Sequence, residues 1–227
     1  MSRDRGPVSH ALLPLYVGRE FPLVTALSVY LDESAEGGTY AIAGYVGPLS
    51  TWDEMFSPCW ARVLLDAPHR ITEFKASDCR QLRGEFTGWS RHEADALTRD
   101  LVSVLLDDNC SPRIAGVGMA ALFPSQAGTP KKSIGNAIHM ACLRNVIAEA
   151  MVLSEGIAKG DKVQFVCDVK PGLEGKISKA YETIRAQLQG TRFANMAGRM
   201  AFGESTLLAP LQAADLLAYE TASRSTA

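Results

Sequence analysis

The sequence feature that most constrains the fold is the stretch Ser28–Ser34, in which apolar and aromatic residues lead directly into two neighbouring carboxylates, Asp32 and Glu33. Branched and aromatic residues of this kind, followed by Gly37 and Gly38, predict a β-strand that crosses a core and delivers an acid at its end. Successive side chains of a strand point to opposite faces of the sheet. We therefore expect only one of Asp32 and Glu33 to face a functional site.

The composition is that of an ordinary soluble globular protein. The chain has 227 residues, of which 47% are hydrophobic and 21% are charged, and this length suits one large domain with a substantial core. Its formal net charge is -2, so the protein has no overall basic field. That charge counts against tight, indiscriminate binding of nucleic acid, although it leaves room for a local basic groove.

Cysteine usage and hydropathy predict a cytoplasmic location. The five cysteines are spread along the chain without a C-x-x-C pair (Cys59, Cys79, Cys110, Cys142 and Cys167). Because neither a disulfide framework nor a structural zinc site is indicated, we expect free thiols in a reducing compartment. The N-terminal apolar run is short and interrupted by proline, which argues against a signal peptide. No apolar run approaches the ~20 residues of a membrane span, so no membrane partner is expected.

Hydrophobic periodicity predicts a single α/β domain over residues 24–227, preceded by an irregular arm at 1–23. Strands are expected at 26–32 and 39–46, which would pair as a hairpin, and at 113–123, 163–168 and 198–204. Helices are expected from Ser50 or Thr51, over 90–107 with Ser90 and Glu93 as a capping box, over 134–155 with Gly156 ending it, and over 173–188 and 208–223. A flexible link is expected at 125–132. This order predicts a mixed central sheet with helices packed on its faces.

Three further acids are candidates for a site shared with Asp32. Asp168 ends the strand expected at 163–168, and sheets of this class place ligands at the carboxyl ends of their strands. Asp215 lies in an apolar helix on the same face as Gln212, and burying it is costly unless it is paired or binds a metal. Glu73 lies in the alternating stretch 71–78. Carboxylate oxygens are the ligands that Mg²⁺ and Mn²⁺ prefer.

Each of these acids also has a plain structural explanation. An acid at a strand end is commonly a turn or capping residue, Asp215 could pair with Arg192 or Arg199, and Glu73 could form an exposed pair with Lys75 of little energetic consequence. Nucleotide-cradle, hydrolase-elbow and zinc motifs are not found in the sequence. The four acids together favour a divalent-metal site.

At these positions the chain resembles the "domain of unknown function 3800" family, which is regarded as having a ribonuclease H-like fold. The resemblance covers about residues 26–222 and is carried by three features: Tyr30–Ser34, Val166–Asp168, and Ser205 with Leu211–Asp215. The middle segments Glu73–Asp78 and Gly84–Trp89 look like the corresponding insertion of the family. The first-strand and final-helix segments are together the most specific part of it.

The resemblance implies a carboxylate site of the ribonuclease H type centred on Asp32, with Asp168 and Asp215 as metal ligands and Glu73 as a fourth. The sequence departs from the family at Lys75, where family members often have histidine. A protonated lysine is a hydrogen-bond donor without a lone pair for a metal. If the residue at this position touches the metal in the family, the lysine implies a site that is altered or inactive.

The resulting hypothesis is hydrolysis of nucleic-acid phosphodiester bonds. Two Mg²⁺ or Mn²⁺ ions about 3.5–4 Å apart would be held by Asp32, Asp168, Asp215 and Glu73. Lys75 would orient the phosphate or stabilise developing charge. Bound cations would reverse the local charge and so allow a mildly acidic protein to accept nucleic acid. The alternative is a non-catalytic interaction or nucleic-acid-binding protein that retains the ribonuclease H-like fold.

Overall fold

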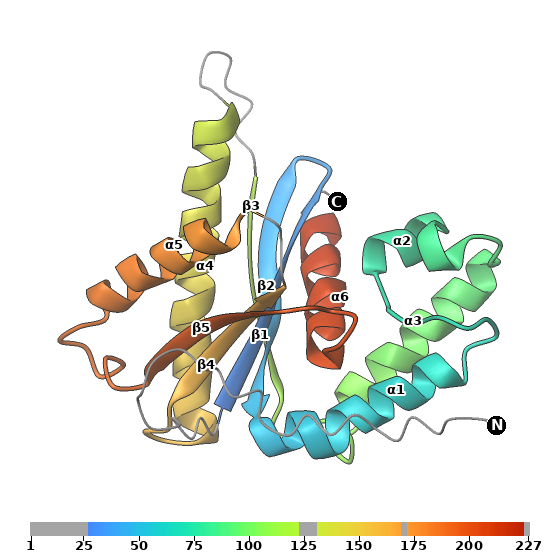
Figure 1. The fold of residues 1–227 in the computed structure, drawn as a ribbon, viewed down its shortest axis with the longest axis horizontal. Coiled ribbons are helices and arrows are strands. Elements are labelled where there is room, and N and C mark those ends of the chain that lie inside the picture. The colour runs from blue at the N-terminus through green and yellow to red at the C-terminus, as the bar shows by residue number, and fades with distance from the viewer. Residues whose placement is uncertain (1–26, 123–130, 169–171, 225–227) are drawn as a thin grey trace.

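The computed structural model describes residues 27–122, 131–168 and 172–224, without the side chains of residues 131–136. The expected arm at 1–23 and the expected link as far as residue 130 lie outside these residues. Within them, the chain forms an α/β structure around a five-stranded mixed sheet of order β3-β2-β1-β4-β5 (Figure 1). The strands are β1 (Leu27–Glu36), β2 (Thr39–Pro48), β3 (Ala115–Leu122), β4 (Val163–Asp168) and β5 (Ala197–Gly203).

The central strand, β1, pairs antiparallel with β2 and parallel with β4. The hairpin predicted between β1 and β2 is confirmed, and its turn residues Gly37 and Gly38 have φ of 54° and 85°, which glycine adopts without strain. β1 is longer than expected and continues past Asp32 to Glu36. Its pairing with β4 nevertheless stops at Leu31, opposite Cys167. Asp32 therefore lies where the two parallel strands separate.

Alternation of side chains along the strands divides the protein into two cores. Leu31 and Phe165 belong to the core on the face covered by α4 (Lys131–Ile157) and α5 (Glu174–Gln187). Tyr30 and Val166 belong to the core on the opposite face, covered by α6 (Ala209–Arg224). Figure 1 shows α4 and α5 on one side of the sheet and α6 on the other. The predicted arrangement of helices on both faces of a mixed sheet is thus confirmed.

A further layer of short helices lies on the outer side of α6 (Figure 1). It consists of η1 (Thr51–Phe56), α1 (Ser57–Leu65), α2 (Ala76–Gln81), η2 (Gly84–Phe86) and α3 (Arg91–Leu106). Its core is aromatic, with ring contacts that lead from Trp60 to Phe74 and from Phe74 to Phe86. Phe74 is 1% exposed, so this core holds in place the segment that carries Glu73 and Lys75.

Helix boundaries were predicted well where a capping motif or a run of periodic residues defines them. Ser90 and Glu93 form the expected capping box at the start of α3. Ser50 makes no side-chain cap, and the helix expected there begins instead as the π-helical turn η1. Pro58, in the first turn of α1, has no N–H to donate to an earlier carbonyl, which accounts for the change of helix type. The prediction that Gly156 ends α4 is wrong, because α4 runs to Ile157.

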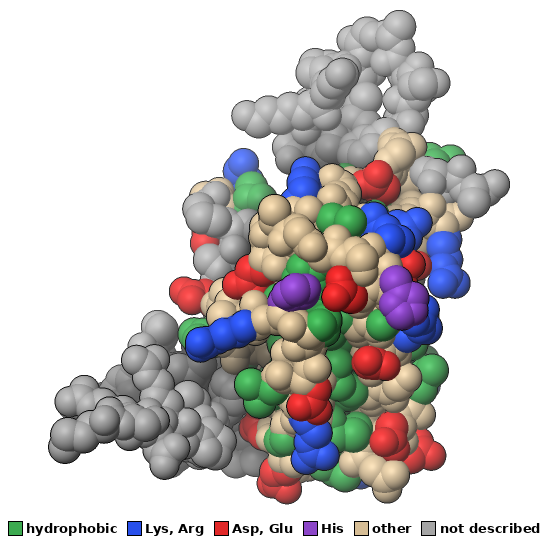
Figure 2. All heavy atoms as spheres, turned by 90° about the vertical axis from the view of Figure 1, so that its right-hand side faces the viewer, with side chains coloured by type: hydrophobic (Ala, Val, Ile, Leu, Met, Phe, Trp, Pro, Cys, Tyr) green, Lys and Arg blue, Asp and Glu red, His purple; other side chains and the backbone are tan. Residues whose placement is uncertain are grey.

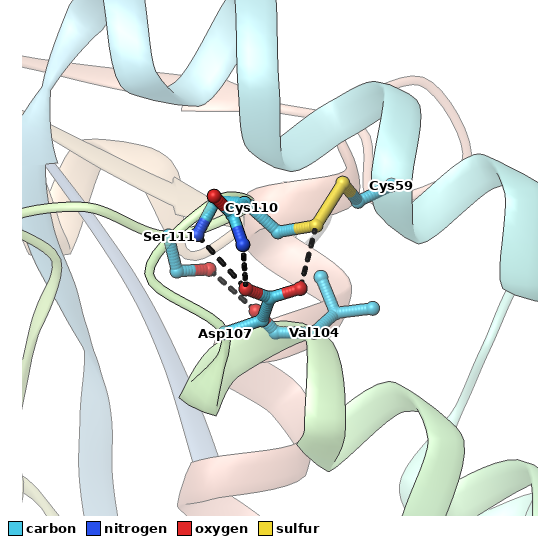
Figure 3. The surroundings of a disulfide bond; sticks show 6 residues. Cys59, Val104, Asp107, Cys110 and Ser111 are labelled. Carbon is cyan, nitrogen blue, oxygen red and sulfur yellow. Dashed lines mark hydrogen bonds between the residues drawn. A yellow bond between two sulfur atoms is a disulfide. The ribbon is translucent and has the colours of Figure 1, made fainter.

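The expectation that all cysteines are free thiols is wrong for two of them. Cys59 of α1 and Cys110, after α3, form a disulfide across 51 residues of sequence (Figure 3). The turn that presents Cys110 is fixed by hydrogen bonds from the N–H groups of Cys110 and Ser111 to the Asp107 carbonyl, at 2.9 and 2.8 Å. Packing of α1 against α3 brings the two sulfur atoms together. The remaining cysteines, Cys79, Cys142 and Cys167, are buried free thiols.

One helix also departs from the expectation that no segment has the length and hydropathy of a membrane span. Residues Ala137–Ile157 of α4, with a mean hydropathy of 1.3 over the best window, are long and apolar enough to cross a membrane by length and composition alone. Leu143, Val146 and Ile147 of this helix are buried in the core against the sheet. Buried core helices of soluble proteins meet the same criterion, so this is weak evidence for a membrane.

Candidate active site

The structure brings three of the predicted residues together where β1 and β4 separate. Asp32 is 8% exposed and shares a hydrogen bond with the carboxyl group of Asp215, which comes from α6. Asp215 Oδ2 also accepts a hydrogen bond from the backbone N–H of Ala76, at 2.6 Å. Asp168, the last residue of β4, accepts a hydrogen bond at its Oδ1 from the backbone N–H of Ser205, at 3.2 Å.

The contact between Asp32 and Asp215 has a clear electrostatic consequence. Burial, and then the neighbouring Asp32 carboxylate, raise the pKa of Asp215 from 3.8 to about 7. The N–H of Ala76 and the ammonium of Lys75 act in the opposite direction but do not cancel the shift. Two buried carboxyl groups in contact cannot both ionise unless a cation compensates the charge; without a cation, one of them keeps its proton. The pair is therefore a place where a cation would be stabilised.

Glu73 and Lys75 complete the cluster from the segment that precedes α2. Lys75 Nζ lies 3.0 Å from Glu73 Oε1 and 3.9 Å from Asp168 Oδ2, and it donates a hydrogen bond to Ser205 Oγ at 3.1 Å. Ser205 Oγ in turn donates to Glu73 Oε1. Partial burial alone would lower the pKa of Lys75, but the carboxylates of Glu73, Asp168 and Asp215 outweigh it and raise that pKa. Lys75 is thus an ammonium held among acids, and not half of an isolated surface pair.

Gln212 holds this segment against α6. Its Oε1 accepts hydrogen bonds from Trp60 Nε1 and from the backbone N–H of Phe74, both at 3.0 Å. Its Nε2 donates to the carbonyl of Ser205 at 2.8 Å. Phe74 lies between Glu73 and Lys75 in the chain, and Ser205 contacts both of their side chains. One buried amide therefore fixes the positions of two segments that build the site.

A second anchor acts on the same segment from the solvent side. The carboxylate of Glu85, in η2, accepts hydrogen bonds from the backbone N–H and the hydroxyl of Thr72 at 2.6 and 2.5 Å, and a longer one from the N–H of Glu73 at 3.3 Å. Although burial acts the other way, these bonds lower the pKa of Glu85. The η2 loop thereby orients the backbone from which Glu73 projects.

Glu33 lies on the opposite face of β1, as the alternation of a strand requires. Its Oε2 accepts a hydrogen bond from Tyr40 Oη at 2.5 Å and lies 3.3 Å from His139 Nδ1 of α4. Tyr40 Oη is also 2.6 Å from His139 Nδ1. Burial, and then Glu33, raise the pKa of Tyr40, so its phenol stays neutral. Asp32 is accordingly the acid that faces Asp215, and Glu33 belongs to a separate polar group.

Sequence reasoning gave no functional role to Ser205, Gln212 or Glu85. In the sequence, Ser205 enters only through the resemblance, and Gln212 only through the resemblance and the helix face that it shares with Asp215. The sequence pattern that indicates a role for Gln212 is a polar residue in an otherwise apolar helix, because a polar group must find hydrogen-bond partners when it is buried. The contacts of Ser205 and Glu85 depend on tertiary folding and left no local pattern.

Two arginines of the segment between α4 and α6 form ion pairs with nearby glutamates. Arg185 pairs with Glu182 at 3.3 Å, and Arg192 pairs with Glu155 at 3.2 Å rather than with Asp215. On the face formed by the short-helix layer, acidic and basic side chains are intermixed (Figure 2). The described side chains of that face therefore form no single-sign patch of the kind that attracts nucleic acid by charge alone.

Comparisons of the chain with known protein families, with curated proteins and with solved structures found no match. The resemblance to the domain of unknown function 3800 family therefore stays a prediction. Within residues 27–122, 131–168 and 172–224, no group of three or more His, Cys, Asp and Glu side chains has the arrangement of a ready metal site.

Proposed function

We propose that the protein is a metal-dependent nuclease of ribonuclease H-like fold that hydrolyses phosphodiester bonds in nucleic acid. The observation that carries this proposal is the buried contact between the Asp32 and Asp215 carboxyl groups. It lies where the parallel pairing of β1 with β4 ends, beside the carboxyl end of β4, and α/β sheets bind their ligands at the carboxyl ends of their strands.

The donor set suits a hard divalent cation. Mg²⁺ usually keeps several waters and is bound through one or two carboxylates together with substrate phosphates, so a pair of carboxylates is sufficient protein ligation. Asp32 and Asp215 would hold the ion, and its binding would replace the proton that keeps Asp215 neutral. The bound ion would activate water and neutralise charge on the phosphate.

The other residues of the cluster would act on the substrate and on the geometry. Lys75 Nζ, 38% exposed at the side chain, is the group positioned to donate to a phosphate oxygen and to stabilise charge that develops there. Glu73, Asp168 and Ser205 hold that ammonium in place. Gln212 and Glu85 fix the backbone that carries it.

The test is cleavage of labelled RNA, DNA and hybrid duplexes in Mn²⁺, Mg²⁺ or EDTA. Wild-type protein should cleave at least one substrate only with metal, and Asp32→Asn and Asp215→Asn should each lower the rate by a factor of about 100 or more, as expected for groups that hold a catalytic charge. Asp100→Asn, which removes an exposed carboxylate of α3, should keep wild-type activity. Cleavage that survives both active-site variants would identify a contaminant and refute the proposal.

A second candidate is a non-catalytic interaction or nucleic-acid-binding protein that retains this fold. The observation in its favour is the partial compensation within the cluster: the single positive charge of Lys75 serves both Glu73 and Asp168, and a proton neutralises Asp215. This candidate predicts no change in melting temperature on addition of Mn²⁺ and no cleavage. A nucleic-acid binder of this kind would show salt-dependent binding that metal does not alter.

A further inference from the structure

We propose that the Lys75 ammonium permanently occupies the place of one cation, so that the site takes a single divalent ion, bound by Asp32 and Asp215. The inference rests on the proposed function, because it assigns the metal content of the same cluster. It differs from the two-ion arrangement that four carboxylates would suggest, and it follows from how the structure distributes them.

The four carboxylates form two unlike pairs. Asp32 and Asp215 are in direct contact with each other, and the second pair, Glu73 and Asp168, flanks the ammonium of Lys75, with Nζ–O distances of 3.0 and 3.9 Å. Carboxylates in contact with one another attract a cation, whereas the carboxylates of Glu73 and Asp168 already have one positive charge between them. The Asp32–Asp215 pair therefore still needs a cation to ionise fully, whereas the Glu73–Asp168 pair already contacts one.

The ammonium is held where it is by its surroundings. Ser205 Oγ accepts a hydrogen bond from Lys75 Nζ and donates one to Glu73, while the Ser205 N–H donates to Asp168. On either side of the lysine, the backbone is fixed by the bond from the Phe74 N–H to Gln212 and by the bond from the Cys79 N–H to the Lys75 carbonyl, at 2.9 Å. A divalent ion between Glu73 and Asp168 would have to displace this anchored side chain.

The charge count of the cluster leads to the same number of ions. Four ionised carboxylates with one ammonium and one divalent ion leave a net charge of minus one, which suits an ion that keeps open positions for phosphate. A second divalent ion would make the cluster positive and would lie beside a protonated amine. Like charges at such separations repel strongly in a partly buried site. Replacing Lys75 with a neutral residue would remove this repulsion between the ammonium and a second divalent ion.

The experiment counts Mn²⁺ bound per folded chain by equilibrium dialysis with electron paramagnetic resonance. Wild type and Lys75→Arg should bind one ion, and Lys75→Gln, which keeps a donor for Ser205 but loses the charge, should bind two. The second ion should bind to Lys75→Gln at least tenfold more tightly than to wild type. Two ions in wild type, or only one in folded Lys75→Gln, would overturn the inference.

A second variant keeps the test decisive if Lys75→Gln does not fold. Glu73→Gln removes a carboxylate that serves the ammonium, so it should leave the affinity of the single ion within about threefold of wild type. Asp215→Asn should abolish binding. A Glu73→Gln protein that loses the ion would overturn the inference while leaving metal dependence intact. No bound Mn²⁺ in wild type or in any variant would refute the proposed function itself, and the inference with it.

Discussion

Replacing Gln212 with leucine should lower the free energy of unfolding by about 3–6 kcal/mol. The side chain is 3% exposed, and leucine has a similar size but can neither donate nor accept a hydrogen bond. The N–H groups of Trp60 and Phe74 and the carbonyl of Ser205 would all lose their partner inside the core.

The magnitude follows from those three groups. A buried donor or acceptor without a partner costs ~1–3 kcal/mol, and local relaxation reduces the largest values, which gives about 3–6 kcal/mol for the set. For a chain of this length, 1 kcal/mol corresponds to roughly 2–4 °C in Tm, so a loss of roughly 6–24 °C is expected.

Gln212→Glu should separate the acceptor role of this side chain from its donor role. The variant still accepts from Trp60 and Phe74, but at neutral pH it turns a carboxylate oxygen toward the Ser205 carbonyl. Only the protonated acid can donate there, so folding raises the pKa of this new carboxyl group above its unfolded value. Stability should therefore be greatest at low pH and fall as pH rises through the folded pKa.

Urea unfolding followed by circular dichroism would measure these losses, and hydrogen exchange would report directly on the Phe74 amide. Gln187→Leu, at an exposed position of α5, is the matched control and should stay within about 0.5 kcal/mol of wild type. The reasoning is refuted if Gln212→Leu unfolds within about 1 kcal/mol of wild type, or if the Phe74 amide exchanges no faster in it.

Three further predictions concern protonation, the disulfide and close packing. Because the pKa of Asp215 rises from 3.8 to about 7 on folding, the folded state keeps a proton that the unfolded chain releases. The free energy of unfolding should therefore fall as the pH rises from about 4 to about 7. Urea titrations at several pH values should show that Asp215→Asn flattens this fall. An equally steep fall in the variant would contradict this assignment. Reduction of the Cys59–Cys110 disulfide should lower the free energy of unfolding by about 4 kcal/mol in the chain-entropy account. The number of thiols titrated in the unfolded protein should rise from three to five on reduction. Five thiols before reduction would show that the bridge does not form. A Cβ at Gly44 would lie 1.8 Å from the Tyr30 carbonyl oxygen, so Gly44→Ala should cost about 3 kcal/mol. By contrast Gly156→Ala, where an added Cβ meets nothing within 4 Å, should stabilise α4 slightly; similar melting temperatures for the two variants would rule out the packing argument.

The main strands and helices could be predicted from the sequence because each depends on nearby residues. The alternation of a regular strand predicts that only one of Asp32 and Glu33 faces a site, and the structure shows that this acid is Asp32. The bounds of β4 match the expected strand at 163–168, since a short run of branched and aromatic residues ends on an acid there. The capping box of Ser90 and Glu93 likewise specifies its helix start within four residues of sequence.

The composition of the site could be predicted only in part, because its decisive contacts join distant segments. The bond from Ser205 to Glu73 spans 132 residues, and the bond from Phe74 to Gln212 spans 138. The pair of Lys75 with Glu73 could be expected from their spacing, but the additional contacts of Lys75 with Asp168 and Ser205 could not. No local sequence pattern specifies that the Lys75 ammonium lies among these acids. The pairing of Cys59 with Cys110 likewise depends on how α1 packs against α3.

The disulfide also makes a closed covalent ring of residues 59–110. The ring contains α2, η2 and α3 together with the segment that carries Glu73 and Lys75. A protease that cuts once inside the ring leaves both new ends attached through sulfur, so the nicked chain would migrate as one species on a non-reducing gel and as two fragments after reduction. The segment that supplies Glu73 and Lys75 would thus stay tethered to the sheet after a backbone break that, outside the ring, would release a fragment.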